Sequence, residues 1–217
     1  MTRLSLSLVL ALSLLPGLAS AGTTAWVSSN HIQIVDLDAG EVVGKIPLKE
    51  FIHDMEFHPS GSEVYVSSSK GLRVADAQAL KFTRKVSDRT TGALAISDDG
   101  SVLAAIHLPP REAVMAAKRA KKPLPAGSVT VYDTNRMEAT GSFDVSANAF
   151  DLVMSGDGAK LYVLVPHEGT VYVHGRDGEL LESLVLADKD TMLSKIDARL
   201  IESTVVIRGP YSAQHGP

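Results

Sequence analysis

The chain has 217 residues, a formal net charge of −4 and no cysteine. The absence of cysteine excludes disulfides, thiolate nucleophiles, cysteine-ligated zinc and covalently attached c-type haem, so stability must come from a packed core. The mildly acidic balance gives no reason to expect a nucleic acid or an anionic lipid as a partner.

The first 21 residues have the pattern of a secretory signal peptide. Arg3 supplies the positive charge, Leu4 to Leu15 form the apolar stretch, and Ala19-Ser20-Ala21 is a small-residue cleavage site. The apolar stretch is too short to be a transmembrane segment, and no second long apolar run follows it. We therefore expect cleavage after Ala21, export to the periplasm or the medium, and one folded domain over residues 22–217.

Three similar phrases recur along the chain: FHPSGSEVYV, ISDDGSVLAA and MSGDGAKLYV. Their turn glycines are Gly61, Gly100 and Gly158, so the two spacings are 100 − 61 = 39 and 158 − 100 = 58 residues. The second spacing is longer because it contains an inserted segment, Leu108 to Gly127. Without this segment the period returns to about 40 residues, which is typical of four-stranded propeller blades.

Each repeat unit is expected to form four short antiparallel strands, because apolar and β-branched residues alternate between clusters of turn residues. The expected units cover about 24–48, 52–86, 92–143 and 150–186. In the first complete unit the four strands are expected at 53–57, 64–67, 72–75 and 81–86. The second strands of three units carry an aromatic residue at an equivalent position: Trp26, Tyr65 and Tyr162.

The third strand of a unit tends to end on aspartate. This residue is Asp36, Asp76 or Asp133 in the first three units, and its side chain can cap the following turn. The fourth unit departs from the pattern, with His174 and Gly175 at the corresponding place.

The first unit lacks an inner strand ahead of residue 24. A propeller that begins on a second strand takes the missing inner strand from its C-terminal end, which hides the sheet edges. The candidate is STVVIRG, residues 203–209. The sequence thus predicts an all-β fold, a β-propeller of about four four-stranded antiparallel blades closed by this strand. A half-propeller that pairs with a second copy, or a truncated form of a longer propeller, are the alternatives.

The chain resembles the YVTN family of β-propeller repeats over about residues 24–186. The segments FHPSGSEVYVSS and VMSGDGAKLYVL carry the resemblance, with EVYV and KLYV in the place of the tetrapeptide that gives the family its name. The resemblance implies an exported or surface protein with a binding role. Propellers of this kind commonly have seven blades, whereas this chain has material for four.

Four histidines are expected on one face of the blades: His31, His53, His107 and His167. Only His53, at the head of an inner strand, would point near a central channel. Because metal ligands must lie about 2.0–2.2 Å from one ion, we expect separate surface or turn histidines. His53 is the single candidate metal ligand, and no cofactor is expected.

The inner-strand positions aligned with His53 are Gly92 and Phe150, which show no repeated polar group. Asp54 and Asp151 align with each other. Their carboxylates could bind a cation, but we favour hydrogen bonds to the backbone of neighbouring blades.

The inserted segment is the part that a repeat alone does not explain. Arg111 to Lys122 contains five basic residues and one acid on strong helix formers, bounded by prolines, which predicts a short helix with a local charge of 5 − 1 = +4. It is either a solvated basic face or a docking element for an acidic protein or a cell-envelope polymer. The candidate partner-binding residues are Arg111, Lys118, Arg119, Lys121 and Lys122.

The sequence contains no motif that indicates catalysis. A nucleophile elbow, a phosphate-binding loop, a dinucleotide fingerprint and H-E-x-x-H are all missing. The favoured function is therefore a non-catalytic binding or scaffolding module of the cell envelope. The alternatives are a propeller subunit or domain of a periplasmic redox enzyme of the dehydrogenase type or of a lactonase-like enzyme, or a propeller fragment.

Overall fold

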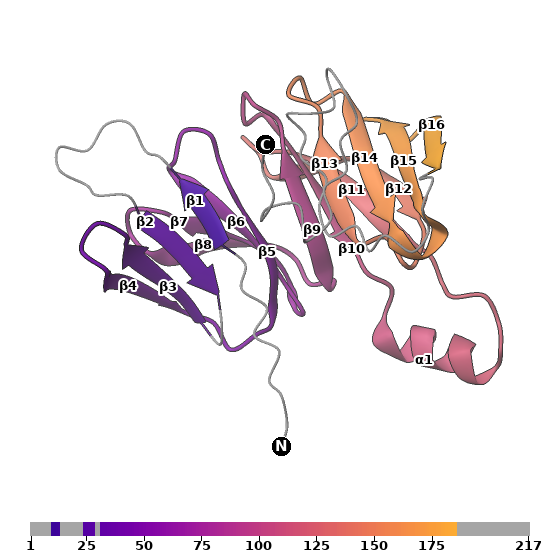
Figure 1. Cartoon of the computed structure of the whole chain (residues 1–217), viewed down its shortest axis with the longest axis horizontal. Helices are drawn as coiled ribbons and strands as arrows, with labels where there is room; N and C mark the ends of the chain where they lie inside the picture. The colour runs from indigo at the N-terminus through magenta and orange to yellow at the C-terminus, as the bar shows by residue number, and fades with distance from the viewer. Residues whose placement is uncertain (1–9, 14–23, 29–30, 186–217) are drawn as a thin grey trace, which may run out of the picture. The chain divides into compact units, whose positions relative to one another are not determined.

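The computed structural model describes residues 10–13, 24–28 and 31–185, which contain four four-stranded antiparallel sheets (Figure 1). Each sheet consists of four strands that are consecutive in the chain, which is the topology of a propeller blade. The chain divides into two compact units, Met1–Thr91 and Gly92–Pro217, and each unit contains two of the blades. None of the described helices has the length and apolar character needed to cross a membrane.

The first unit contains the first and second blades. The strands of the first blade are β1 (Leu10–Ser13), β2 (Thr24–Ser28), β3 (His31–Asp36) and β4 (Glu41–Pro47), and those of the second blade are β5 (Ile52–Phe57), β6 (Glu63–Ser68), β7 (Gly71–Asp76) and β8 (Lys81–Ser87). One face of the first blade, with Trp26 and Ile34, packs on Met55 and Val64 of the second to form the core of the unit. The edge of the Trp26 ring meets the Phe57 ring, with 5.5 Å between their centroids.

The inner strand of the first blade is β1, and this corrects a prediction. We expected residues 203–209 to pair with β2, but Leu10–Ser13 takes that edge, with Leu10 opposite Val27 and Ser13 opposite Thr24. Residues 203–209 lie outside the described part of the chain. The physical reason is proximity in sequence, since closing a short loop costs less entropy than closing one that runs through the whole domain. Cleavage after Ala21 would remove β1 and open this edge of β2.

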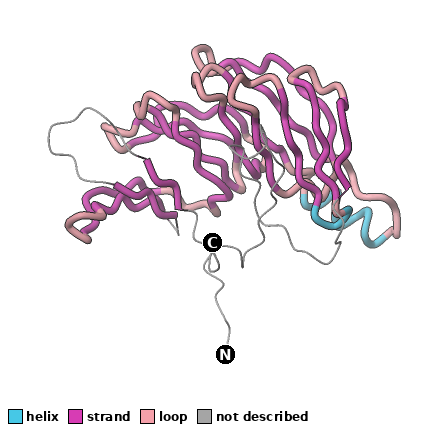
Figure 2. The backbone as a smooth tube through the Cα atoms, turned by 45° about the horizontal axis from the view of Figure 1, so that its top comes forward, coloured by secondary structure: helices cyan, strands magenta, loops and turns pink. Residues whose placement is uncertain are grey.

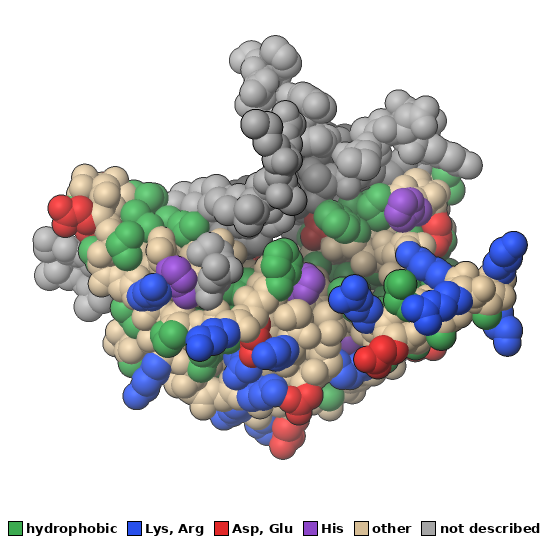
Figure 3. All heavy atoms as spheres, turned by 90° about the horizontal axis from the view of Figure 1, so that it is seen from below, with side chains coloured by type: hydrophobic (Ala, Val, Ile, Leu, Met, Phe, Trp, Pro, Cys, Tyr) green, Lys and Arg blue, Asp and Glu red, His purple; other side chains and the backbone are tan. Residues whose placement is uncertain are grey.

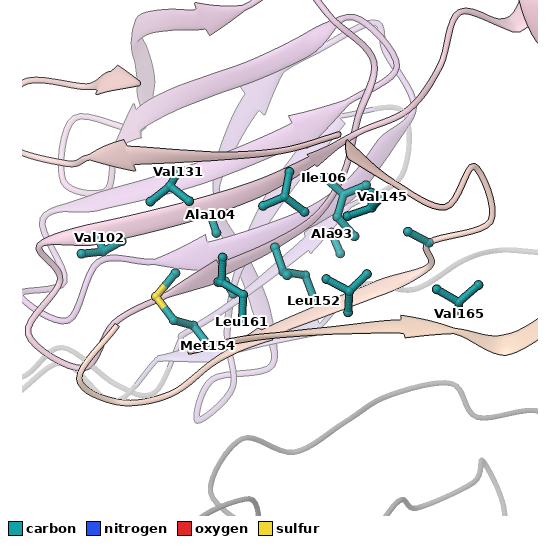
Figure 4. Close-up of a cluster of buried hydrophobic side chains, with 14 residues drawn as sticks. Ala93, Val102, Ala104, Ile106, Val131, Val145, Leu152, Met154, Leu161 and Val165 are labelled. Atoms are coloured by element: carbon teal, nitrogen blue, oxygen red, sulfur yellow. The ribbon is translucent and has the colours of Figure 1, made fainter. Parts of the chain in front are cut away.

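The second unit contains the third and fourth blades. The elements are β9 (Thr91–Ile96), β10 (Val102–His107), α1 (Arg111–Arg119), β11 (Gly127–Asp133) and β12 (Glu138–Val145), followed by β13 (Asp151–Met154), β14 (Lys160–Val165), the 3-10 turn η1 (Pro166–Glu168), β15 (Thr170–Gly175) and β16 (Leu180–Val185). Side chains of the two blades point toward one another and form a continuous apolar core, with Ala104 and Ile106 on one side and Leu152 and Leu161 on the other (Figure 4). This packing fixes the two blades of the unit against each other.

The repeated phrases of the sequence form the turns between the first and second strands of three blades. Gly61, Gly100 and Gly158 have φ values of +71°, +75° and +69°, the left-handed region that favours glycine. In the third blade the Ser97 hydroxyl donates to Asp99 over 2.6 Å, and the Asp99 carboxylate also accepts from the N–H and hydroxyl of Ser101. These hydrogen bonds lower the pKa of Asp99 to about 2, and the bond from Ser97 has the largest effect.

The aspartates at the ends of the third strands cap the following turns, as predicted. Asp36 accepts the N–H groups of Asp38 and Ala39, each at 2.9 Å, and Asp76 and Asp133 accept equivalent bonds. In the fourth blade the Nδ1 atom of His174 lies 3.2 Å from the Gly178 carbonyl oxygen instead.

Each blade has a residue with positive φ in this turn, four residues after the capping aspartate in the first three blades and three residues after Gly175 in the fourth. The residues and values are Gly40 (+69°), Leu80 (+49°), Met137 (+53°) and Gly178 (+92°). The first and fourth blades thus use glycine at a left-handed position where the second and third blades carry a large side chain.

A partly buried ion pair ties the start of the second blade to its third strand. The Arg73 guanidinium donates to Glu50 over 2.7 Å, and the Ser68 hydroxyl donates to the other carboxylate oxygen over 2.6 Å. Burial by itself raises the pKa of Glu50, but these two hydrogen bonds and the charges of Arg73 and Lys70 outweigh it and hold the pKa below its usual value. The Glu50 side chain is 7% exposed and that of Arg73 is 22% exposed, so the pair is partly shielded from water.

Candidate functional site

The inserted segment joins β10 to β11 in the third blade, where Figure 2 shows the helix on a long loop that leaves the strands. Residues 108–126 separate His107 from Gly127, whereas only Ser69 and Lys70 separate the equivalent strands β6 and β7 of the second blade. We call the stretch 108–126 the basic loop. Because β10 and β11 pair along their whole length up to His107 and Ser128, the loop leaves from a fixed base.

The base of the loop is held by a buried polar contact. The Nε2 atom of His107 lies 3.0 Å from the Tyr132 hydroxyl, and His107 is 1% exposed. This corrects the expectation that His107 is a surface or turn histidine. It lies on the last position of a central strand, where burial requires a hydrogen-bond partner, and the tyrosine of the neighbouring strand supplies one.

Helix α1 begins at Arg111, as predicted, and ends at Arg119, three residues before the expected Lys122. It ends there because the backbone turns back on itself: the N–H of Lys122 donates to the Ala117 carbonyl and that of Lys121 to the Lys118 carbonyl. This is the Schellman pattern of hydrogen bonds, which satisfies the last carbonyl groups of a helix. Glu112 in the first turn and Lys118 and Arg119 in the last turn suit the helix dipole.

Lys121 occupies the left-handed position of this helix end, with φ of +51°. Glycine is the usual residue there because a side chain costs about 1 kcal/mol or more in that conformation. The backbone therefore places a lysine where a glycine would be more stable. The sequence contains no signal for this strain, because the position of the helix end is set by hydrogen bonds several residues away.

Leu108, the first residue of the basic loop, packs on the apolar core of the unit, whereas helix α1 contributes nothing to that core. No residue of α1 is buried, and Met115 is 43% exposed. Met115 shares a helix face with Arg111, Lys118 and Arg119, because residues three or four apart in a helix lie side by side. Figure 3 shows Lys and Arg side chains gathered on the projecting part where Figure 1 places α1.

The predicted partner-binding residues all lie in this loop, on the helix or immediately after it, and all are exposed. They are Arg111, Lys118, Arg119, Lys121 and Lys122. Within the described part of the chain the ion pairs join Arg73 to Glu50, Lys85 to Asp88 and Arg136 to Asp133, so none of the five cations of the loop has an acidic partner. Their charge is therefore available to another molecule.

The histidines predicted to share a face have separate environments. His31 lies beside Gln33, with 2.8 Å between their Nε2 atoms, and His167 is exposed in η1. In the residues that the structure describes, no three His, Cys, Asp or Glu side chains gather closely enough to hold a metal ion.

Among the described residues, His53 is the histidine with a buried ring nitrogen that lacks a hydrogen-bond partner. Its Nε2 atom is buried without a hydrogen-bond partner, and the ring packs edge-on against the exposed Phe51, with 5.1 Å between centroids. Burial lowers the pKa of His53, and the charge of Asp54 offsets this only in part. His53 lies at a bulge, since the pairing with β6 shifts between Ile52 and Asp54. Bulges of this kind re-aim a side chain, which is common beside functional sites.

The two aligned aspartates hydrogen-bond to the backbone, although within their own strands. Asp54 accepts the N–H of Met55 over 2.9 Å, and Asp151 accepts that of Leu152 over 3.0 Å. Each of these bonds runs to the next residue of the same strand. Both carboxylate side chains also make further interactions.

No family model and no curated protein sequence matches the chain. Among solved structures, a chain of hydrazine synthase from Kuenenia stuttgartiensis is similar, with a TM-score of 0.60 and 18% sequence identity. The match covers 77% of this chain and 52% of that one, so the chain spans about half the length of the structure it matches. Together with the four sheets, this likeness confirms the all-β propeller fold. Membership of the YVTN family stays a prediction.

Proposed function

We propose that the chain is an exported, non-catalytic β-propeller that acts as a binding or scaffolding module in the cell envelope. In this proposal the basic loop contacts an acidic protein surface or an anionic cell-envelope polymer. The observation that supports it most is the set of five exposed cations, which have no acidic partner among the described residues and lie on or just after a helix that adds nothing to the core.

The charge distribution gives the loop a long-range attraction for an acidic partner, which the rest of the chain lacks. The loop carries 5 − 1 = +4, so the remainder of the chain carries −4 − 4 = −8. An acidic partner is therefore drawn to the loop and repelled elsewhere, which orients the encounter. The strained Lys121 fits this role, because strain retained at one residue is typical of positions kept for contact.

The test is recovery of partners from an envelope extract by the purified protein and by a variant with Lys118, Arg119, Lys121 and Lys122 changed to Ser. A matched control changes the same number of exposed cations on the blades: Lys45, Lys49, Lys81 and Lys160. We expect the loop variant to lose the partner and the control to keep it. Recovery should also fall with added salt, since the screening length shrinks from about 10 Å at 0.1 M to 3 Å at 1 M.

Equal recovery by the loop variant and the wild-type protein would remove the basic loop from the proposal. Equal loss in the loop variant and the control would show that net charge, and not this surface, decides binding.

Export is a separate part of the proposal and rests on the sequence pattern at residues 1–21. The intact mass of the protein isolated from the periplasm or medium tests it. A mass corresponding to residues 22–217 is expected, and a mass that includes residues 10–13 would show that β1 is kept.

A second candidate function is a propeller subunit or domain of a periplasmic redox enzyme. The likeness to a chain of hydrazine synthase and the unsatisfied Nε2 atom of His53 favour it. Metal analysis of the purified protein tests this candidate. Stoichiometric copper, iron or calcium that disappears in a His53→Ala variant would favour it over the binding module.

A further inference from the structure

The basic loop is much longer than the other connections between neighbouring strands from β3 onward. Those connections contain two to five residues each, whereas the basic loop runs from 108 to 126. The short connections also contain basic residues: Lys49, Lys70, Arg89, Arg136 and Arg176. There, however, the paired strands on either side hold the backbone in a turn. In this part of the chain the basic loop is therefore where lysine and arginine lie on backbone that can change its conformation.

Helix α1 is held in place by little besides its own backbone hydrogen bonds. None of its residues is buried, and within the described part of the chain no ion pair or side-chain hydrogen bond joins it to a blade. A helix of nine residues is marginal by itself, because isolated helices shorter than about 12–15 residues are barely stable in water. The helix can therefore unwind locally while the blades stay folded.

The C-terminal end of the helix is the place where unwinding is easiest. Lys121 has φ of +51°, which a residue with a side chain adopts only under strain, so opening of this turn releases the strain. The hydrogen bond from the Lys122 N–H to the Ala117 carbonyl is lost in the same step. An endoprotease binds several residues of its substrate in an extended conformation, and this opening supplies such a segment.

We propose that Lys118–Lys122 is a cleavage site for an endoprotease that cuts after lysine or arginine. Within this segment three peptide bonds qualify: those after Lys118, Arg119 and Lys121. The bond after Lys122 does not, because the next residue is Pro123, which lacks an N–H group and has a fixed φ.

Cleavage after Lys121 is a hydrolysis in which the protease supplies the catalytic groups and water is the second substrate. The C–N bond between Lys121 and Lys122 breaks, and the oxygen of water joins the carbonyl carbon. Lys121 is left with a carboxylate, and the nitrogen of Lys122 takes up the protons and becomes an ammonium group. No oxidant or reductant takes part.

The third blade survives such a cut, because its strands on the two sides of the cut are paired. β10 and β11 pair from Val102 opposite Asp133 to His107 opposite Ser128. The same apolar core contains side chains from both sides, among them those of β10, β11 and β14. The buried contact between His107 and Tyr132 also crosses the cut. The product is therefore two fragments that stay together as one folded particle.

Limited digestion of the full chain with trypsin, used as the probe protease, tests the site. The first cut within residues 24–185 is identified from the fragment masses. The loop variant has three exposed basic residues changed to Gln: Lys118, Arg119 and Lys121. A matched control has three exposed lysines of the blades changed to Gln: Lys45, Lys81 and Lys160.

We expect the wild type and the control to be cut first after Lys118, Arg119 or Lys121, and the loop variant to be cut at least about tenfold more slowly within residues 24–185. The two fragments should elute together in native buffer and separate in urea. The same fragments should be found in wild-type protein recovered from the cells that make it or from their medium, whereas the loop variant should be recovered without this cut.

Three results would overturn the proposal. The first is a first cut of the wild type elsewhere within residues 24–185, and the second is separation of the fragments in native buffer. The third is wild-type protein without this cut in both the cells and the medium. Because cleavage is read from masses alone, these outcomes do not depend on whether the basic loop binds a partner.

Discussion

The first and fourth blades end the described array in different ways. The second face of the first blade carries Val27, Gln33 and Lys45, which pair across β2, β3 and β4 and are half-buried or exposed. One face of the fourth blade, which we call the distal face, carries five side chains that are at most 8% exposed: Val153, Tyr162, Leu164, Val171 and Val173. Only the second of these two faces is apolar throughout.

This difference shows two ways to end a repeat array. A face of mixed polarity can meet water directly, because single exposed apolar side chains cost little. A contiguous apolar face must be covered or it becomes a site of association. The comparison therefore predicts that equivalent substitutions in the two blades have different effects on the free energy of unfolding.

The largest effects are expected at the equivalent aromatic residues. Trp26→Ala should lower the free energy of unfolding by about 4 kcal/mol, since a large buried ring leaves a cavity in the core of the first unit. Tyr162→Ala should lower it by about 3 kcal/mol, because Tyr162 is packed equally closely on the distal face. Urea denaturation measures both, and a loss under about 1 kcal/mol for Tyr162→Ala would show that its face is not packed.

A pair of valines sharpens the comparison. Val171→Ser should lower the free energy of unfolding by about 2 kcal/mol, because it places a hydroxyl at a position that is only 2% exposed. Val35→Ser in the half-buried face of the first blade should cost about 0.5 kcal/mol. Similar losses for the two variants in urea denaturation would contradict the difference between the faces.

The two units also differ in their use of charge, since the ion pair between Glu50 and Arg73 lies in the first. Glu50→Gln should lower the free energy of unfolding by about 2 kcal/mol at pH 7. Because the folded pKa of Glu50 is below the unfolded value, its stabilisation is present above that value, about 4.3, and is lost as the pH falls through the folded pKa. Denaturation at several pH values should therefore show the wild type and the variant converging in acid. A difference that stays constant down to pH 3 would rule out this origin.

The smallest effects are expected at the left-handed turn residues. Gly40→Ala in the first blade should lower the free energy of unfolding by about 1 kcal/mol because φ is +69°, although no atom lies within 4 Å of the added methyl group. Met137→Gly in the third blade should raise the free energy of unfolding by about 0.5 kcal/mol, since it relieves the same backbone strain. Thermal denaturation of the two variants checks the opposite signs.

The sequence predicted the features that depend on neighbouring residues. The turn glycines, the capping aspartates and the start of α1 were all predictable, because each is fixed by a few adjacent residues. The four-stranded blades were predictable because the same pattern recurs about every 40 residues.

The features that depend on distant residues were not predictable. The pairing of β1 with β2, the burial of His107 beside Tyr132 and the ion pair between Glu50 and Arg73 join strands or loops that the repeat does not specify. For the candidate site, the five cations could be identified from sequence, whereas the strained backbone of Lys121 could not.

The proposal that the basic loop serves contact and not stability is tested most directly by its replacement. In this variant residues 110–126 give way to Ser-Lys, the two residues that join β6 and β7 in the second blade, so that Leu108 and the buried Pro109 are kept. The measurement is the recovery of partners from envelope extract, with the free energy of unfolding determined on the same preparation. We expect recovery to be lost while the free energy of unfolding changes by less than about 1 kcal/mol, since no residue of α1 is buried. Partner recovery that survives in a folded loop-replaced protein would contradict the account.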